Sequence, residues 1–76
     1  MELDETQRRL LRVVDERGPV GDEAIAEELR RGADRIEVDE VRALAAELQR
    51  RALLEQSESA PDRWQLTADG RLALMR

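Results

Sequence analysis

The sequence predicts an α+β domain that is mainly helical, and three observations lead to this fold class. Apolar residues recur at intervals of three and four in three successive segments, as on the buried face of a helix. Two short stretches of alternating apolar and polar residues follow, with a proline-containing turn between them. The chain of 76 residues is too short for a second domain, so we expect residues 1–76 to form one unit.

The first two helices are expected at about residues 4–17 and 22–31. Asp4 or Thr6 is suited to cap the start of the first helix, and Gly18 followed by proline ends it. We expect the second helix to begin with Asp22 as its N-cap and to end at Gly32. Val20, between the two helices, is predicted to be a short extended piece. The inward faces consist of Leu3, Leu10, Leu11 and Val14, with Val13 beside them, in the first helix, and Ile25, Ala26 and Leu29 in the second.

A third helix is predicted over "DEVRALAAELQRRA", residues 39–52, with Asp39 as its cap. Its apolar stripe is the strongest periodic signal in the chain. The stripe consists of Val41, Leu44, Ala45, Leu48 and Ala52.

A β-hairpin is expected after the third helix. The segments "LLEQSES" and "RWQLT" form its strands, and "APD" forms the turn between them. Trp64 and Leu66 share one face, so Trp64 is predicted to pack in the core and to direct its indole N–H to solvent or to a carbonyl. The functional alternative for Trp64 is an exposed contact. The rival fold is a plain helical bundle, against which Pro61 and the alternation count. The tail "ADGRLALMR", residues 68–76, is expected to form a short closing helix, into which Asp69 and Gly70 turn the chain.

The stretch "IAEELRRGADRIEVDEVRALAAELQRRALLEQ" resembles the second and third helices of bacterial and archaeal winged-helix regulators. Val41, Leu44 and Leu48 match the helix positions of that family. Ala52 stands where the family usually has glycine at the exit to the first wing strand. "LTADGR" is similar to the segment that often closes the wing. The resemblance covers essentially the whole chain and implies a winged helix: a three-helix core, a C-terminal hairpin wing and a short closing helix.

DNA binding, in a small transcriptional regulator, is what this resemblance implies. In a helix-turn-helix domain the third helix enters the major groove, and its exposed side chains meet the base edges. Arginine in the wing or before the third helix is suited to contact phosphates. The alternative is that the arginines are solvated residues paired with nearby carboxylates. The candidate DNA-binding residues are Arg35, Arg42, Ala43, Ala46, Gln49, Arg50 and Arg63.

The net charge of −5 opposes this interpretation, because phosphate neutralisation supplies most non-specific DNA affinity. All 13 basic residues are arginine, which together with the acidity indicates a GC-rich coding bias or a salt-adapted source. Charges over residues 39–51 sum to zero, and the wing carries Glu58 and Asp62 beside Arg63. The second hypothesis is therefore a winged-helix protein-interaction module that does not bind DNA and uses the alanine-surfaced third helix as its docking surface.

Catalysis is not expected, since the chain has no histidine or cysteine and no glycine-rich phosphate loop. No metal, cofactor or small-molecule substrate is indicated. No apolar run reaches the roughly 20 residues that a membrane-spanning helix needs, so a cytoplasmic location without membrane contact is expected. The sequence leaves open whether the chain forms a homodimer or binds another protein.

Overall fold

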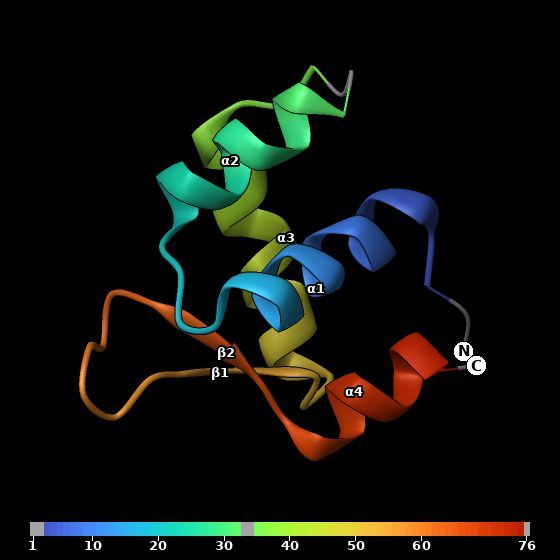
Figure 1. The fold of residues 1–76 in the computed structure, drawn as a ribbon, viewed down its shortest axis with the longest axis vertical. Coiled ribbons are helices and arrows are strands. Elements are labelled where there is room, and N and C mark those ends of the chain that lie inside the picture. Colours follow the sequence, from blue (N-terminus) through green and yellow to red (C-terminus); the bar gives the residue numbers. More distant parts are fainter. Residues whose placement is uncertain (1–2, 33–34, 76) are drawn as a thin grey trace.

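The structure, a computed structural model, describes residues 3–32 and 35–75, and within these ranges it contains four helices and one antiparallel pair of strands (Figure 1). The predicted α+β, mainly helical class is confirmed. Residues 33 and 34, within the predicted link between the second and third helices, lie outside the described residues. The elements are α1 (Glu5–Arg17), α2 (Asp22–Arg31), α3 (Val38–Arg50), β1 (Leu54–Gln56), β2 (Trp64–Leu66) and α4 (Ala68–Met75).

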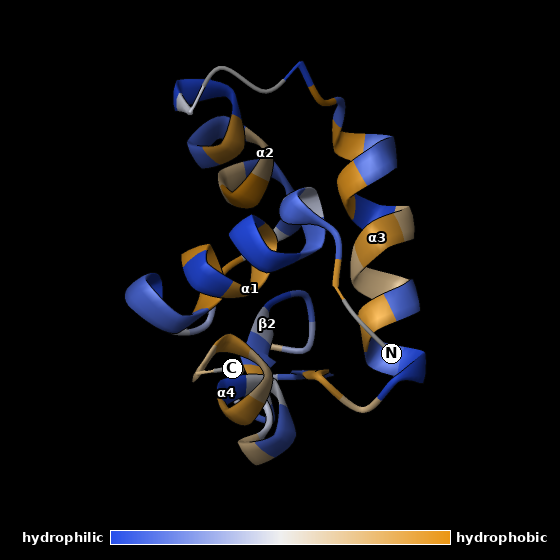
Figure 2. Cartoon of the chain, turned by 90° about the vertical axis from the view of Figure 1, so that its right-hand side faces the viewer, coloured by the Kyte–Doolittle hydropathy of each residue, from blue (hydrophilic) through white to orange (hydrophobic). Residues whose placement is uncertain are grey.

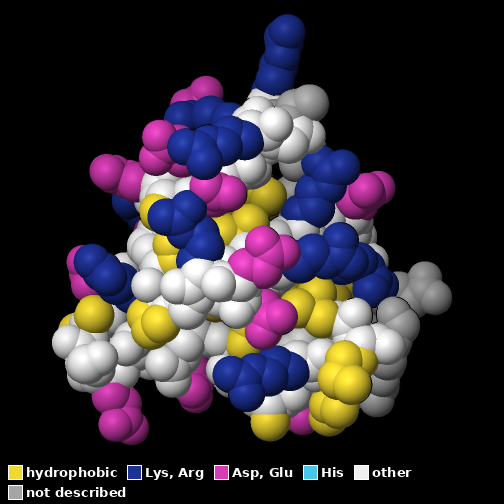
Figure 3. Space-filling view, in the orientation of Figure 1, with side chains coloured by type: hydrophobic (Ala, Val, Ile, Leu, Met, Phe, Trp, Pro, Cys, Tyr) yellow, Lys and Arg dark blue, Asp and Glu magenta, His cyan; other side chains and the backbone are white. Residues whose placement is uncertain are grey.

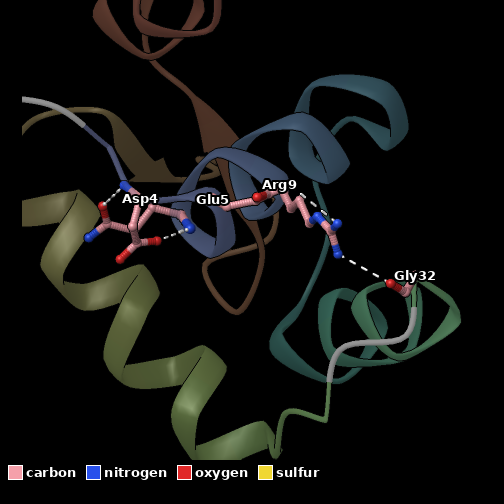
Figure 4. Close-up of polar contacts among 5 residues, drawn as sticks. Asp4, Glu5, Arg9 and Gly32 are labelled. Carbon is pink, nitrogen blue, oxygen red and sulfur yellow. Dashed lines mark hydrogen bonds and ion pairs between the residues drawn. The ribbon is translucent and has the colours of Figure 1, made fainter.

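Helix α1 begins as its sequence predicts, with Asp4 as the N-cap. The Asp4 carboxylate accepts from the backbone N–H of Gln7 at 2.8 Å, and the Gln7 side chain accepts from the Asp4 N–H at 3.1 Å. Arg9 then joins α1 to the end of α2, because its guanidinium donates to the carbonyl of Gly32 at 3.2 Å (Figure 4). Gly18 ends α1 with a φ of 74°, where glycine is favoured.

Helix α2 has the predicted extent, but its predicted cap is wrong. Gly21 is the N-cap, and Asp22 is the first helical residue. The Asp22 side chain does not cap the helix; it accepts from the indole N–H of Trp64 at 2.8 Å. A carboxylate in the first turn of a helix interacts favourably with the helix dipole, as one at the N-cap does. The sequence pattern therefore looks the same whether Asp22 is the N-cap or the first helical residue.

Helix α3 is shifted from the predicted range of 39–52. Glu37, not Asp39, is the N-cap, and the side chain of Glu40 accepts from its backbone N–H at 3.4 Å. The helix ends at Arg50 because Ala52 adopts a positive φ of 62°. The backbone N–H of Ala52 donates to the carbonyl of Gln49 at 2.9 Å, and the N–H of Leu53 donates to the carbonyl of Leu48, also at 2.9 Å. These two bonds form a Schellman motif, whose left-handed position glycine usually occupies. Ala52 is exposed and does not extend the buried stripe.

Replacing Ala52 with glycine should therefore stabilise the protein. The left-handed conformation costs an L-residue about 1–2 kcal/mol, whereas the added freedom of glycine in the unfolded chain costs about 0.4–1 kcal/mol. We expect Ala52→Gly to raise the free energy of unfolding by up to about 1 kcal/mol in urea denaturation. Ala43→Gly, at an exposed position inside α3, is the control and should lower it by about 1 kcal/mol. A lower free energy of unfolding for Ala52→Gly would contradict the claim that the left-handed conformation of Ala52 is strained.

The two strands pair in the register Leu54 with Leu66 and Gln56 with Trp64. The proline-containing turn is confirmed: Arg63 N–H donates to the carbonyl of Ala60 at 2.8 Å, three residues earlier. On the other edge of β2, Trp64 exchanges two backbone hydrogen bonds with Val20, at 2.8 and 3.1 Å. The predicted short extended piece at Val20 is thus confirmed as a single-residue β-bridge to β2.

Helix α4 starts one residue after Thr67, whose hydroxyl accepts from the N–H of Gly70 at 3.0 Å. The same hydroxyl donates to the carbonyl of Ala52 at 2.6 Å. The short closing helix predicted for the tail "ADGRLALMR" is confirmed, and Asp69 and Gly70 lie inside it, not in a turn before it. Gly70 is buried against the backbone of Leu53, and a side chain at this position would collide with the Leu53 carbonyl oxygen.

The core lies where α1, α2 and α3 turn their apolar faces toward one another and toward the sheet (Figure 2). Trp64 is 9% exposed and belongs to this core, so its predicted packing role is confirmed. The predicted partner of its indole N–H, solvent or a carbonyl, is wrong, because the donor meets the Asp22 carboxylate. None of the described helices is long and apolar enough to cross a membrane. The buried residues are Leu10, Leu11, Val14, Val20, Ile25, Ala26, Leu29, Ile36, Val41, Ala45, Leu48, Leu54, Trp64 and Leu66.

Candidate nucleic-acid interface

The predicted residues Arg42 and Arg63 come from different elements and line the same hollow. Arg42 lies in the first half of α3, and Arg63 immediately precedes β2. The hollow has a volume of about 780 Å³ and is open to solvent between the start of α2, α3 and the hairpin turn. Its lining residues are Arg17, Pro19, Val20, Gly21, Asp22, Glu23, Ala24, Glu27, Arg42, Asp62 and Arg63. The fold therefore brings two of the seven candidate residues together.

Arg42 is 64% exposed and lies beside two carboxylates. Its Nε is 3.4 Å from Oδ2 of Asp22, and its Nη1 is 3.6 Å from Oδ1 of Asp39. Both distances are longer than those of strong charge-assisted hydrogen bonds, which are about 2.7–2.9 Å. Exposed ion pairs of this kind contribute little to stability, so Arg42 can leave its partners at small cost.

Arg50, Gln49 and Ala46 lie farther along α3. Arg50 is exposed and forms an ion pair with Glu47 at 2.7 Å, one turn earlier in the helix. Gln49 is exposed and Ala46 is half-buried. The alternative considered for the arginines, pairing with neighbouring carboxylates, thus describes both Arg42 and Arg50 in this conformation.

Arg35 and Ala43 line a second hollow, of about 440 Å³, between the start of α1 and α3. Both residues are exposed, and the hollow is floored by Ile36 and Leu44. The neighbouring arginines are occupied: Arg30 donates to the carbonyl of Ile36 at 2.9 Å, and Arg31 pairs with Glu28 at 3.0 Å. Among the described residues, no ion pair involves Arg35.

Positive and negative side chains are interleaved over the face shown in Figure 3, and no large area of one sign is visible there. The first hollow follows the same pattern. Arg17, Arg42 and Arg63 line it together with Asp22, Glu23, Glu27 and Asp62, so the sum of its formal charges, +3 and −4, is −1. Arg17 is itself paired with Glu28 at 2.7 Å. Arg63 is exposed, and no ion pair involves it within the described ranges.

Sequence reasoning missed Asp22 as a residue of this surface. The residue was interpreted as a helix cap, whereas its two carboxylate oxygens contact Trp64 of β2 and Arg42 of α3. One signal in the sequence points to this role. Gly21 precedes Asp22 and is itself a suitable N-cap, which leaves the carboxylate of Asp22 available for a distant partner.

Comparison of the chain with protein-family models, with curated proteins and with solved structures gives no match. The described residues contain no group of three or more acidic, histidine or cysteine side chains arranged to hold a metal ion.

Proposed function

We propose that this chain is a winged-helix DNA-binding module that acts in transcriptional control. The order of the described elements supports the proposal: three helices, a hairpin and a short closing helix follow one another as in the resemblance noted above. In this assignment α3 is the helix that enters the major groove, and β1, β2 and the turn between them form the wing.

The observation that carries the proposal is the shared hollow of Arg42 and Arg63. A duplex that contacts both residues would place its major groove against α3 and one phosphate strand against the wing. Arg42 exchanges its long contacts to Asp22 and Asp39 for a phosphate or a guanine edge, and Arg63 has no ion pair to break among the described residues. Ala43, exposed one residue after Arg42, is small enough to approach a thymine methyl group.

Titration of labelled genomic DNA fragments at several salt concentrations tests this function. We expect measurable affinity at low salt and a linear fall of log K with log salt concentration, with a slope of about −0.9 for each phosphate contacted. With Arg42 and Arg63 as the main contacts, the slope should be small, about −2. Far-UV circular dichroism at each salt concentration verifies that the protein is folded throughout. Absence of binding by the folded protein at low salt would refute the proposal.

The second hollow favours one alternative function, a protein-interaction module that does not bind DNA. Exposed Ala43 lines this hollow with the half-buried Leu44 and the buried Ile36, so the hollow has a small apolar centre, and the exposed Arg35 and Glu40 also line it. A small apolar centre beside exposed charged residues is typical of protein contacts. The titration above separates the two functions, because only the DNA-binding module gains affinity as salt is lowered.

A further inference from the structure

The carboxylate of Asp22 joins three elements of the fold. Its Oδ1 accepts from the Trp64 indole at 2.8 Å, and its Oδ2 is 3.4 Å from Nε of Arg42. The side chain of Asp22 is only 20% exposed, and Trp64 is 9% exposed. The bond to the indole is the shorter of the two contacts, so this partly buried carboxylate holds the Trp64 ring against the start of α2, whereas the exposed Arg42 has only a long contact to it.

This contact lies between the two parts of the proposed DNA-binding surface. Trp64 is the neighbour of Arg63, and Arg42 projects from α3 into the same hollow as Arg63. The backbone of Trp64 is already held by Val20. The bond to Asp22 therefore acts on the orientation of the indole against the start of α2, and not on whether the hairpin forms.

We propose that Asp22 is a positioning residue, whose carboxylate holds the wing against the start of α2, beside α3, so that Arg42 and Arg63 reach one DNA duplex together. The inference rests on the proposed function. It implies two opposing effects of the same group: the negative charge of Asp22 repels phosphate, while its hydrogen bond to Trp64 keeps the surface aligned.

Two variants separate these effects because they change the charge equally. Asp22→Asn keeps an oxygen that can accept from the Trp64 indole, whereas Asp22→Ala removes both the charge and the acceptor. Glu23→Gln is the matched control, since Glu23 is the next residue in α2, is exposed, and has no hydrogen bond or ion pair among the described residues. Trp64→Phe is a fourth variant, which removes the indole N–H and leaves the carboxylate in place.

DNA titration at low and moderate salt compares the four variants with the unmodified chain. Asp22→Asn should bind at least as tightly as Glu23→Gln, because both remove one negative charge. Asp22→Ala should bind about three- to tenfold more weakly than Asp22→Asn, the range expected for the loss of one hydrogen bond. Its salt slope should also be smaller by about 1, since one arginine no longer reaches a phosphate.

The single tryptophan provides an independent readout, because the chain gives one indole N–H signal in a nitrogen-15 NMR spectrum. Exchange of this hydrogen with solvent should be slow in the unmodified chain and in Asp22→Asn, and fast in Asp22→Ala. Equal affinities, equal salt slopes and equal exchange rates for Asp22→Asn and Asp22→Ala would overturn the positioning role.

Two further outcomes are also decisive. If circular dichroism shows that Asp22→Ala does not fold, Trp64→Phe replaces it in the test. DNA binding about three- to tenfold weaker than that of the unmodified chain supports the positioning role, and unchanged binding overturns it. If the unmodified chain binds no DNA at low salt, the proposed function itself fails and the positioning role falls with it. If the unmodified chain binds DNA but Asp22→Ala and Asp22→Asn bind it with equal affinity, the positioning role alone fails and the proposed function stands.

Discussion

Replacing Trp64 with alanine is expected to lower the free energy of unfolding by about 3–5 kcal/mol. The side chain is the largest in the core, and it packs where the sheet meets the helices. Alanine would leave a cavity there and an Asp22 carboxylate without its indole donor. Because small domains are only marginally stable, this loss should leave much of the Trp64→Ala protein unfolded at 25 °C.

Urea denaturation followed by far-UV circular dichroism measures this effect without relying on tryptophan fluorescence. Trp64→Phe is the matched comparison, because it keeps a buried ring and loses the hydrogen bond to Asp22. We expect it to cost about 1–3 kcal/mol, less than the alanine variant. Equal stability of the alanine variant and the unmodified chain would show that Trp64 is not a core residue.

Gly70→Ala is expected to destabilise the protein by about 1–3 kcal/mol, although alanine is the better helix former. On helix propensity alone, the substitution in α4 would stabilise by up to about 1 kcal/mol. A Cβ at this position, however, collides with the Leu53 carbonyl oxygen and lies 3.1 Å from Cδ2 of Leu66. The backbone of Leu53 cannot rotate away as a flexible side chain would, so α4 must move off the sheet.

The same urea measurement separates helix propensity from the collision with Leu53, because the first would raise the free energy of unfolding of Gly70→Ala and the second would lower it. Ala68→Gly, at the exposed first residue of α4, is the control for propensity and should cost at most about 1 kcal/mol. A Gly70→Ala protein that is as stable as the unmodified chain, or more stable, would mean that α4 does not pack closely on Leu53.

Most features that depend on neighbours three or four residues apart were predicted from the sequence, with the cap of α3 as an exception, because Glu37 and not Asp39 caps that helix. Asp4 caps α1, the apolar stripe of α3 is buried at Val41, Ala45 and Leu48, and the turn after Ala60 forms between the predicted strands. In each case the residues that give the signal lie within a few positions of the structure that they form.

Features that depend on distant partners were not predicted. Asp22 contacts Arg42 and Trp64, which lie 20 and 42 residues farther along the chain. Local patterns contain no information about such contacts, and the cap assignment for Asp22 was wrong for this reason. Gly70 was likewise interpreted as a turn residue, because its contact with Leu53 becomes visible only once α4 is placed against the sheet.

In the candidate site, too, the features set by local spacing were predictable and those set by distant contacts were not. The exposure of Arg42, Ala43, Gln49 and Arg50 follows from the period of α3, which the sequence contains. The proximity of Arg42 to Arg63 follows from the packing of the hairpin beside α2 and α3. The ion pair of Arg50 with Glu47 has local spacing and was anticipated among the alternatives, whereas the pairing of Arg42 with Asp22 was not.

The central claim, that α3 and the hairpin bind DNA as one surface, is tested most directly by the salt slopes of three single variants. Arg42→Gln, Arg63→Gln and Arg12→Gln change the charge equally, but Arg12 is exposed on α1 and lines a separate hollow between α1 and α2. We predict that the slope of log K against log salt concentration decreases in magnitude by about 1 for Arg42→Gln and for Arg63→Gln and stays unchanged for Arg12→Gln. Equal slopes in all three variants would contradict the claim.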